Sequence, residues 1–231
     1  MNVETTQPVI YAKGLTRVYQ LGDSEVIGIS QVDLEIAAGE LVVLKGNSGS
    51  GKSTLLSLLA GLDRPSAGEL TVARHDLNHA SDSQLTHFRR EVVGMVFQSF
   101  NLLPTLNVLE NICLPALLAG KSVGETRPKA MELLRWLEIE DRLHHIPAQL
   151  SGGEMQRTAI ARALINEPAI ILADEPTGNL DSRNGQIVMD LLAELNRKWK
   201  RTVLIATHST LADQLASVRM DLKDGMITSL A

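Results

Sequence analysis

One run of eight residues constrains the fold of this chain more than any other feature: Gly46, Asn47, Ser48, Gly49, Ser50, Gly51, Lys52 and Ser53. The run follows a short apolar stretch, 41–44, and precedes a helix-like stretch, 52–60. Glycines allow successive backbone N–H groups to point inward at an anion, and the start of a helix adds partial positive charge. The spacing G-x-x-x-x-G-K-S between a strand and a helix therefore predicts a loop that binds phosphate.

The last residues of this loop have side chains suited to a nucleotide with a metal ion. Lys52 would bring a full positive charge to the β- and γ-phosphates, and the Ser53 hydroxyl would offer a ligand to Mg²⁺. We count the next residue, Thr54, with the loop as a nucleotide-binding position. A chance glycine turn is the alternative, but the strand, the loop and the helix occur together in the required order.

The apolar runs of the chain predict the sheet that supports this loop. Val9–Val18 and Val32–Ile36 alternate apolar and polar residues, as half-buried strands do. Four further runs lack this alternation: Leu41–Leu44, Val92–Phe97, Ala169–Ala173 and Thr202–Ala206. Strands covered on both faces have such a composition, so the sequence predicts an α/β fold with a parallel sheet wrapped by helices.

Helix-like segments separate these strands and concentrate in the middle of the chain. From about residue 99 to 167 the pattern is mostly helical, which predicts an inserted helical subdomain. A serine followed three residues later by Gln or Glu predicts three helix starts, at Ser81, Ser122 and Ser151. Arg64–Gly68 predicts a turn, and Asp224-Gly225 predicts a hairpin that closes the chain.

Charge, cysteine content and hydropathy exclude several classes of protein. The 22 Lys and Arg against 27 Asp and Glu give a net charge of −5, which argues against nucleic acid as the main partner. Cys113 is the only cysteine, which favours a reducing compartment. No apolar stretch reaches the roughly 18 residues that span a bilayer, and the N-terminus does not resemble a signal peptide. We therefore expect a cytoplasmic protein whose membrane contact comes through a partner.

Two acidic residues follow one of the predicted buried strands. In a parallel sheet, Asp174 at the end of the strand 169–173 would lie beside the phosphate loop, where it could hold Mg²⁺ directly or through water. Glu175 could polarise an attacking water as a general base. The alternative is an acidic pair that caps the next turn, because Pro176 and Gly178 follow.

A second glycine-containing helix start follows in the predicted helical region. Ser151 would cap the helix, and Gly152 and Gly153 would leave its N–H groups open to an anion. By itself this pattern is more typical of an ordinary capped helix. A single phosphate loop already serves one nucleotide, so a second anion site in the same chain requires an explanation.

The run LSGGEMQ at 150–156, followed by an apolar strand ending in Asp-Glu, resembles the signature of the ATP-binding-cassette (ABC) ATPases. Gln98 matches the glutamine of that family's Q-loop, 179–181 (Asn-Leu-Asp) matches its D-loop, and His208 matches its switch histidine. Tyr19 matches the aromatic residue that stacks on adenine. The resemblance covers nearly the whole chain and implies that the nucleotide is ATP.

The resemblance implies a single ABC ATPase domain over 1–231, a P-loop NTPase with a RecA-like parallel core, an antiparallel β subdomain and the helical insertion. It also implies a homodimer that closes head-to-tail over ATP. Ser151, Gly153 and Asp181 of one chain would then contact the ATP held by the other. Gln98 would sense Mg²⁺, held with Ser53 and Asp174, while Glu175 would polarise the water and His208 would hold the γ-phosphate.

Longer matches, including GLDRPSAGE and LADEPTGNLD, resemble the ATPase subunits of bacterial lipoprotein-releasing (LolD-type), macrolide-export (MacB-type) and cell-division (FtsE-type) systems. They imply a peripheral subunit on the cytoplasmic face of the inner membrane that drives a transmembrane permease docked near Phe97–Leu118. Ser209 and Thr158 depart from the usual residues at their positions without changing a catalytic role. The basic run Arg197–Arg201 fits a solvated helix end better than a contact with a partner or with lipid.

Two other classes of protein carry the same signature. ABC-type ATPases of DNA repair have long coiled coils or zinc modules between the phosphate loop and the signature, whereas the interval 54–151 here has no sustained heptads and only one cysteine. ABC ATPases that act in regulation or on ribosomes usually have two cassettes in one chain, and this chain has one. The sequence therefore favours the hypothesis of a transporter ATPase subunit over that of an ATPase acting on DNA or ribosomes.

Overall fold

The computed structural model describes residues 8–230, so the prediction about the extreme N-terminus (residues 1–7) lies outside the described residues. Strands occupy the following ranges: β1 Ile10–Leu21, β2 Ser24–Ile36, β3 Leu41–Lys45, β4 Ala67–Val72, β5 His75–Asp76, β6 Val93–Phe97, β7 Ile170–Asp174, β8 Thr202–Ala206, β9 Val218–Lys223 and β10 Met226–Leu230. The α-helices are α1 Lys52–Leu59, α2 Asp82–Glu91, α3 Val108–Leu118, α4 Val123–Trp136, α5 Gly152–Leu164 and α6 Ser182–Trp199. Short 3₁₀ turns are η1 Glu140–Arg142, η2 Pro147–Gln149 and η3 Thr210–Ala212.

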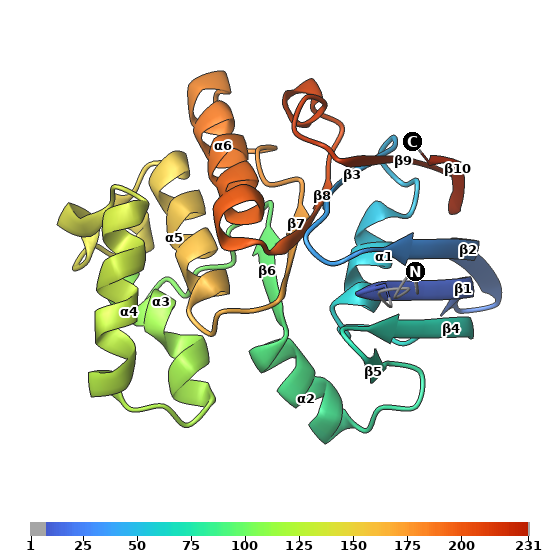
Figure 1. Cartoon of the computed structure of the whole chain (residues 1–231), viewed down its shortest axis with the longest axis horizontal. Helices are drawn as coiled ribbons and strands as arrows, with labels where there is room; N and C mark the ends of the chain where they lie inside the picture. The colour runs from blue at the N-terminus through green and yellow to red at the C-terminus, as the bar shows by residue number, and fades with distance from the viewer. Residues whose placement is uncertain (1–7, 231) are drawn as a thin grey trace, which may run out of the picture.

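A six-stranded sheet in the order β10-β9-β3-β8-β7-β6 forms the centre of the molecule (Figure 1). All of its neighbouring pairs are parallel except β9 with β10, which form the predicted closing hairpin. The register places Asp174 opposite both Phe97 of β6 and Ala206 of β8. The carboxyl ends of these strands therefore meet at one edge of the sheet, beside the end of β3. The predicted parallel α/β core is confirmed.

The missing alternation in these strands follows from burial on both faces. Along β3, Val42 and Leu44 belong to one hydrophobic cluster, whereas Leu41 and Val43 belong to another. All four side chains are 2% exposed or less. The first cluster includes α1, α2 and the antiparallel sheet, and the second includes α3 to α6. Since each face needs apolar side chains, the strand is apolar at every position.

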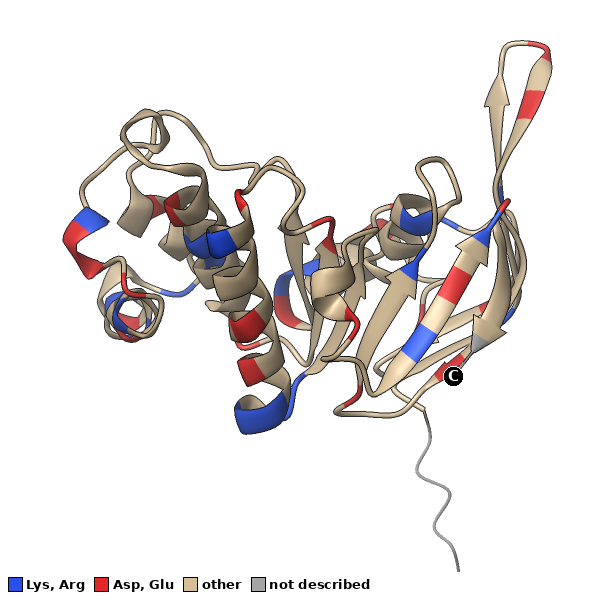
Figure 2. Cartoon of the chain, turned by 90° about the horizontal axis from the view of Figure 1, so that it is seen from above, with Lys and Arg blue, Asp and Glu red and all other residues tan. Residues whose placement is uncertain are grey.

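A second sheet, in the order β2-β1-β4-β5, is antiparallel and lies on the other side of α1 (Figure 1). The hairpin formed by the end of β1 and the start of β2 projects from the body of the molecule (Figure 2). The turn predicted over Arg64–Gly68 is too long, because Ala67 already pairs with Thr16 of β1. That correction adds β4, a strand that the sequence analysis did not predict.

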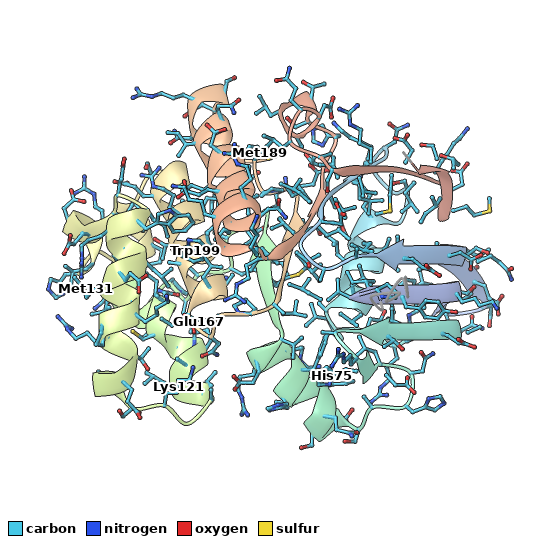
Figure 3. All side chains as sticks on the ribbon, viewed as in Figure 1. His75, Lys121, Met131, Glu167, Met189 and Trp199 are labelled. Atoms are coloured by element: carbon cyan, nitrogen blue, oxygen red, sulfur yellow. The ribbon has the colours of Figure 1, made fainter. Side chains whose placement is uncertain are left out.

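Helices α3, α4 and α5 pack together beside α6, on the far side of the central sheet from the antiparallel sheet (Figure 1). Trp199 at the end of α6 (Figure 3) lies 4.9 Å from Trp136 of α4, measured between ring centroids. The capping boxes predicted at Ser81, Ser122 and Ser151 are all present. Within residues 8–230, no helix combines the length and apolar character needed to cross a membrane.

Candidate functional site

The glycine-rich loop connects β3 to α1 and curls around its own lysine. The Lys52 side chain is buried, and its Nζ donates to the carbonyl oxygens of Gly46 at 2.8 Å and Asn47 at 3.0 Å. Gly51 caps α1 with a φ of 105°, and a Cβ there would come within 2.4 Å of the Gly28 carbonyl oxygen. Only glycine fits this position, so the loop conformation is fixed by sequence, with the N-terminus of α1 open to an anion.

Asp174 ends β7 next to this loop, with its carboxylate half-buried. Burial raises the pKa of the Asp174 carboxyl, an effect that a hydrogen bond from the Ser53 side chain opposes. Within the described residues, Asp174 Oδ1 is a buried oxygen without a hydrogen-bond partner. A buried acceptor of this kind is costly unless it gains a partner, so Asp174 and Ser53 form a donor set suited to a hard cation such as Mg²⁺.

Glu175 follows at once and its carboxylate is surrounded by hydrogen-bond donors. Its Oε1 lies 3.0 Å from His208 Nδ1 and 3.7 Å from Lys52 Nζ. Its Oε2 accepts from Thr207 Oγ1 at 3.0 Å and from the His208 backbone N–H at 3.3 Å. The residue has a φ of 44°, which non-glycine residues seldom adopt. Strain at a charged residue is typical of functional sites, and here it turns the carboxylate toward the loop.

Gln98 approaches the same edge of the sheet from the end of β6. Asn179 Nδ2 donates to the Gln98 backbone oxygen at 3.0 Å, and Gln98 Nε2 lies 3.4 Å from Asn179 Oδ1. A Cβ on Gly178 would come within 2.7 Å of Gln98 Nε2, so this glycine leaves room for the glutamine. The amide of Gln98 is thereby held between the loop and the segment that precedes α6.

A cavity of about 500 Å³ is lined by most of these groups. Four predicted site residues beside it do not line it: Gly46, Asn47, Ser50 and Asp174. The predicted site residues that line it come from five separate segments of the chain: Tyr19, Ser48, Gly49, Gly51, Lys52, Ser53, Thr54, Gln98, Glu175 and His208. Among these residues, Lys52 lies near Glu175 and Glu175 contacts His208, whereas Tyr19 pairs with the apolar Val26 across β1 and β2. The cavity therefore has a polar part suited to phosphates and an apolar part suited to a base.

Ser151, Gly153 and Asp181 are not among the residues that line this cavity. Ser151 caps α5, and Asp181 caps α6 by accepting from the Asn184 backbone N–H at 2.9 Å. Gly153 is packed so closely to Asn184 that a Cβ there would approach its Oδ1 to 2.2 Å. The two helix starts are therefore neighbours and form a separate polar surface. The structure brings together the cavity residues and keeps this second set apart.

Glu154 organises the start of α5. Its Oε2 accepts from the Ser151 backbone N–H and hydroxyl, both at 2.8 Å, and its Oε1 accepts from Arg142 Nε at 2.8 Å. Burial by itself would raise the pKa of the Glu154 carboxyl, but these hydrogen bonds and the Arg142 charge lower it to about 2. The carboxylate thus stays ionised and fixes the Ser151 side chain.

Several residues of the site were not found from the sequence. Val26, Ile27 and Gly28 line the cavity, and Thr207 donates to Glu175. Of these residues, only Gly28 could have been found from the sequence, because a glycine inside a strand often marks a place where another group approaches the backbone closely. Here a Cβ on Gly28 would lie 2.8 Å from Tyr19 Cε2 and 2.9 Å from Thr54 Cγ2.

Comparison with known proteins agrees with this geometry. A family model described as ABC transporter matches residues 29–178. Lipoprotein-releasing system ATP-binding protein LolD of Idiomarina loihiensis is 43% identical over 223 residues, which are 96% of this chain and 97% of LolD. Macrolide export ATP-binding/permease protein MacB of Wolinella succinogenes is 46% identical over 96% of this chain, but the chain spans only 34% of that MacB.

Solved structures of the ATP-binding cassette MJ0796, a protein of Methanocaldococcus jannaschii, are similar over almost the whole chain. A dimeric post-hydrolysis state bound to ADP and Pi has a TM-score of 0.90 and 41% identity, and covers 96% of this chain and 97% of the other. A second dimeric structure of that cassette also gives a TM-score of 0.90, at 42% identity. The chain belongs to the ABC transporter family, as an ATP-binding subunit that hydrolyses ATP.

Proposed function

We propose that this subunit closes head-to-tail with a second copy over two ATP molecules and that the closure drives a membrane permease. The observation that carries the proposal is the separation of two sets of residues in one chain. Lys52, Gln98, Glu175 and His208 surround the cavity, whereas Ser151, Gly153 and Asp181 lie outside it. A second copy could supply the latter set to the open side of the nucleotide. The dimers reported for the MJ0796 cassette support this arrangement.

In the proposed mechanism the chain positions ATP and neutralises its charge. The loop N–H groups and Lys52 hold the β- and γ-phosphates, and Tyr19 stacks on the adenine. Glu175 takes a proton from the attacking water, and His208 holds the γ-phosphate. Thr207 and the His208 backbone N–H fix the carboxylate so that it faces the loop. No covalent intermediate is needed, because positioning and electrostatic stabilisation suffice for phosphoryl transfer to water.

Mg²⁺ fits the donors beside the loop. Ser53, Gln98 and Asp174 would hold it, and the unpartnered Asp174 Oδ1 is the acceptor that supports this assignment. When bound, the ion would neutralise the charge that develops on the phosphate oxygens.

A second cavity, of about 330 Å³, is the proposed docking site for the permease. It lies between α2, β6 and α5, and includes Phe97, Asn101 and Pro115 from the predicted docking segment. Leu62, Leu117 and Leu118, which are 51%, 36% and 70% exposed, lie on the segments that line it. Arg89 and Arg90 are also part of its wall. Arg162 of α5 is the third arginine that lines it. An apolar hollow with exposed leucines and three arginines suits an amphipathic helix with an acidic end.

Phe100 and Leu103 stay proposed contacts of the same partner, although neither lines this cavity. Leu103 is 44% exposed, and Phe100 is half-buried with its carbonyl bound by Arg162 Nη2 at 2.8 Å. Both residues lie in the irregular segment between β6 and α3, next to Gln98. Movement of a docked partner would thus be passed to Gln98, and so to the nucleotide cavity, through the segment between β6 and α3.

The finer proposal is that the chain serves lipoprotein release, efflux or mechanotransmission from the cytoplasmic face of the bacterial inner membrane. Its support is the similarity to LolD over 96% of this chain and to MacB over 34% of that protein's length. The cargo would be selected by the permease, because the polar residues that line the cavity around Lys52 are suited to a nucleotide.

The docking proposal is tested by recovery of the chain with membranes. The tagged chain and its Leu118→Asp variant are expressed in cells of the organism that encodes the chain. For each, we measure the fraction recovered with washed membranes and, separately, the Kd for ATP. We expect the variant to bind ATP normally and to lose membrane recovery, while Leu21→Asp, on the distant hairpin, retains both. Equal recovery of Leu118→Asp and the unchanged chain would move the docking site elsewhere. Stimulation of hydrolysis by DNA or ribosomes instead of membranes would overturn the transport role.

A further inference from the structure

Two charged side chains meet behind Tyr19 and contact both its hydroxyl and its ring. Tyr19 Oη donates to Asp63 Oδ2 at 3.0 Å, and Arg17 Nε donates to the same oxygen at 2.8 Å. The guanidinium carbon of Arg17 lies 4.6 Å from the centroid of the Tyr19 ring. Each of the three side chains therefore contacts the other two. We call Arg17, Tyr19 and Asp63 the ring clamp.

Arg17 covers one face of the Tyr19 ring, which leaves only the other face free for a ligand. Tyr19 lines the nucleotide cavity, whereas Arg17 and Asp63 are not among its lining residues. A guanidinium over an aromatic face is a favourable cation–π contact, and it excludes other groups from that face. The face that remains open is the one from which a base in the cavity could be stacked.

The surroundings of Tyr19 explain why its ring needs this support. The residue lies near the end of the projecting β1–β2 hairpin (Figure 2), where Leu21, Val26 and Ile27 are 65%, 45% and 61% exposed. Tyr19 itself is half-buried, and without contacts that hold its ring it would sample several rotamers, which a ligand would have to order on binding. Side chains that order the ring beforehand would remove that entropic cost.

Asp63 connects the ring to the helix that follows the phosphate loop. It lies four residues beyond the end of α1, and its backbone N–H donates to the Ser57 carbonyl oxygen of that helix at 3.3 Å. Its Oδ1 accepts from the Arg64 backbone N–H at 2.8 Å, which leaves Oδ2 for Tyr19 and Arg17. The carboxylate thereby fixes the distance between the proposed base platform and the proposed phosphate site.

We propose that Arg17 and Asp63 are positioning residues that hold Tyr19 ready to stack on the nucleotide base. This inference rests on the proposed function, in which Tyr19 contacts adenine. Neither residue lines the cavity, so both act through the ring. They contribute to the affinity for a nucleotide and not to the affinity for a ligand that has phosphates but no base.

The test compares ATP with inorganic triphosphate, which lacks the base. Calorimetric titrations of the full chain are made with Arg17→Met, Asp63→Asn and Tyr19→Phe, each of which breaks one contact of the ring clamp. We expect the Kd for ATP to rise about threefold to tenfold, the factor expected when one side chain must be ordered on binding. The Kd for triphosphate should change by less than about twofold, since the phosphate loop is untouched.

A neighbouring pair provides the matched control. Arg64 follows Asp63 and pairs with Asp82 at 2.9 Å, on the exposed surface and without contact to Tyr19. Arg64→Met should leave both Kd values unchanged. Combining Asp63→Asn with Tyr19→Ala should weaken ATP binding no more than Tyr19→Ala alone, because a positioning residue has no effect once its ring is gone.

The outcomes separate the two proposals. If Tyr19→Ala leaves ATP affinity unchanged, the stacking role in the proposed function is wrong. If Tyr19→Ala weakens ATP binding but the Arg17 and Asp63 variants do not, stacking stands and the ring clamp inference is overturned. Equal losses for ATP and triphosphate, or additive losses in the double variant, would also overturn it, since either result means that the residues act independently of the ring.

Discussion

Replacing Glu175 by glutamine removes one negative charge from the centre of the cavity and almost no volume. The amide oxygen can keep the two hydrogen bonds now made by Oε2, from Thr207 Oγ1 at 3.0 Å and from the His208 backbone N–H at 3.3 Å. The amide nitrogen then replaces Oε1, which lies 3.7 Å from Lys52 Nζ. The fold should therefore survive, while the group proposed to accept the proton of water is lost.

A positioned general base accelerates a reaction by about 100-fold to 10,000-fold, which corresponds to about 3–5 kcal/mol of barrier height. We expect Glu175→Gln to lower the ATP hydrolysis rate by that factor. Lys52 keeps its hydrogen bonds to the loop carbonyls and no longer has the carboxylate of Glu175 as an ionic partner. Its charge is then more available to the phosphates, so the Kd for ATP should stay within about threefold or become lower.

The assay is single-turnover phosphate release, with ATP affinity measured separately by calorimetry. Glu132→Gln on α4 is the matched control, because it makes the same chemical change at a side chain that is 61% exposed and remote from the cavity. It should hydrolyse ATP like the unchanged chain. Hydrolysis by Glu175→Gln at the unchanged rate would refute the assignment of Glu175 as the base.

Three further predictions follow from contacts around the site. Lys52→Ala should raise the Kd for ATP at least about tenfold in calorimetry, because it removes the buried cation from the phosphate end. Gly28→Ala should raise the Kd for ATP in calorimetry and leave the melting temperature nearly unchanged. The new Cβ, 2.8 Å from Tyr19 Cε2, would push the end of the Tyr19 ring out of place without disturbing the core. Arg142→Met should lower the free energy of unfolding at pH 7, measured in urea, because it removes a hydrogen bond and a positive charge from Glu154. The Glu154 pKa of about 2, against an ordinary 4.5, stabilises the fold above pH 4.5 and ceases to do so as the pH falls toward 2, so this difference should vanish in acid.

Local patterns in the sequence were enough to predict the core of the fold. The apolar runs of β3, β6, β7 and β8 are uninterrupted because each strand is buried on both faces, and each capping box acts within four residues. The phosphate loop is equally local, since a φ of 105° at Gly51 is a requirement of one position. Such features depend on residues that are close together in the chain, so they can be predicted from the sequence.

Contacts between distant residues could not be predicted in this way. Asp63 meets Tyr19 across 44 residues and Arg17 across 46, and Asn179 meets Gln98 across 81. None of these polar residues has a local pattern that distinguishes it from a solvated side chain. Strand β4 was missed for a related reason, because its partner in the sheet is β1, far away in sequence. Family resemblance supplied the roles of Gln98, Tyr19 and His208, which spacing alone could not.

In the proposed dimer, Ser151 of one chain completes the ATP site of another. The most direct test measures the mass in solution of Glu175→Gln, with and without ATP, by size exclusion with light scattering. We predict a single chain of 25.1 kDa without nucleotide and a particle of twice that mass with ATP. Adding Ser151→Arg, a bulky cation at the exposed start of α5, should keep the chain at the single mass even with ATP bound. If the double variant forms the ATP-dependent dimer as readily as Glu175→Gln, Ser151 does not complete the ATP site of the second chain.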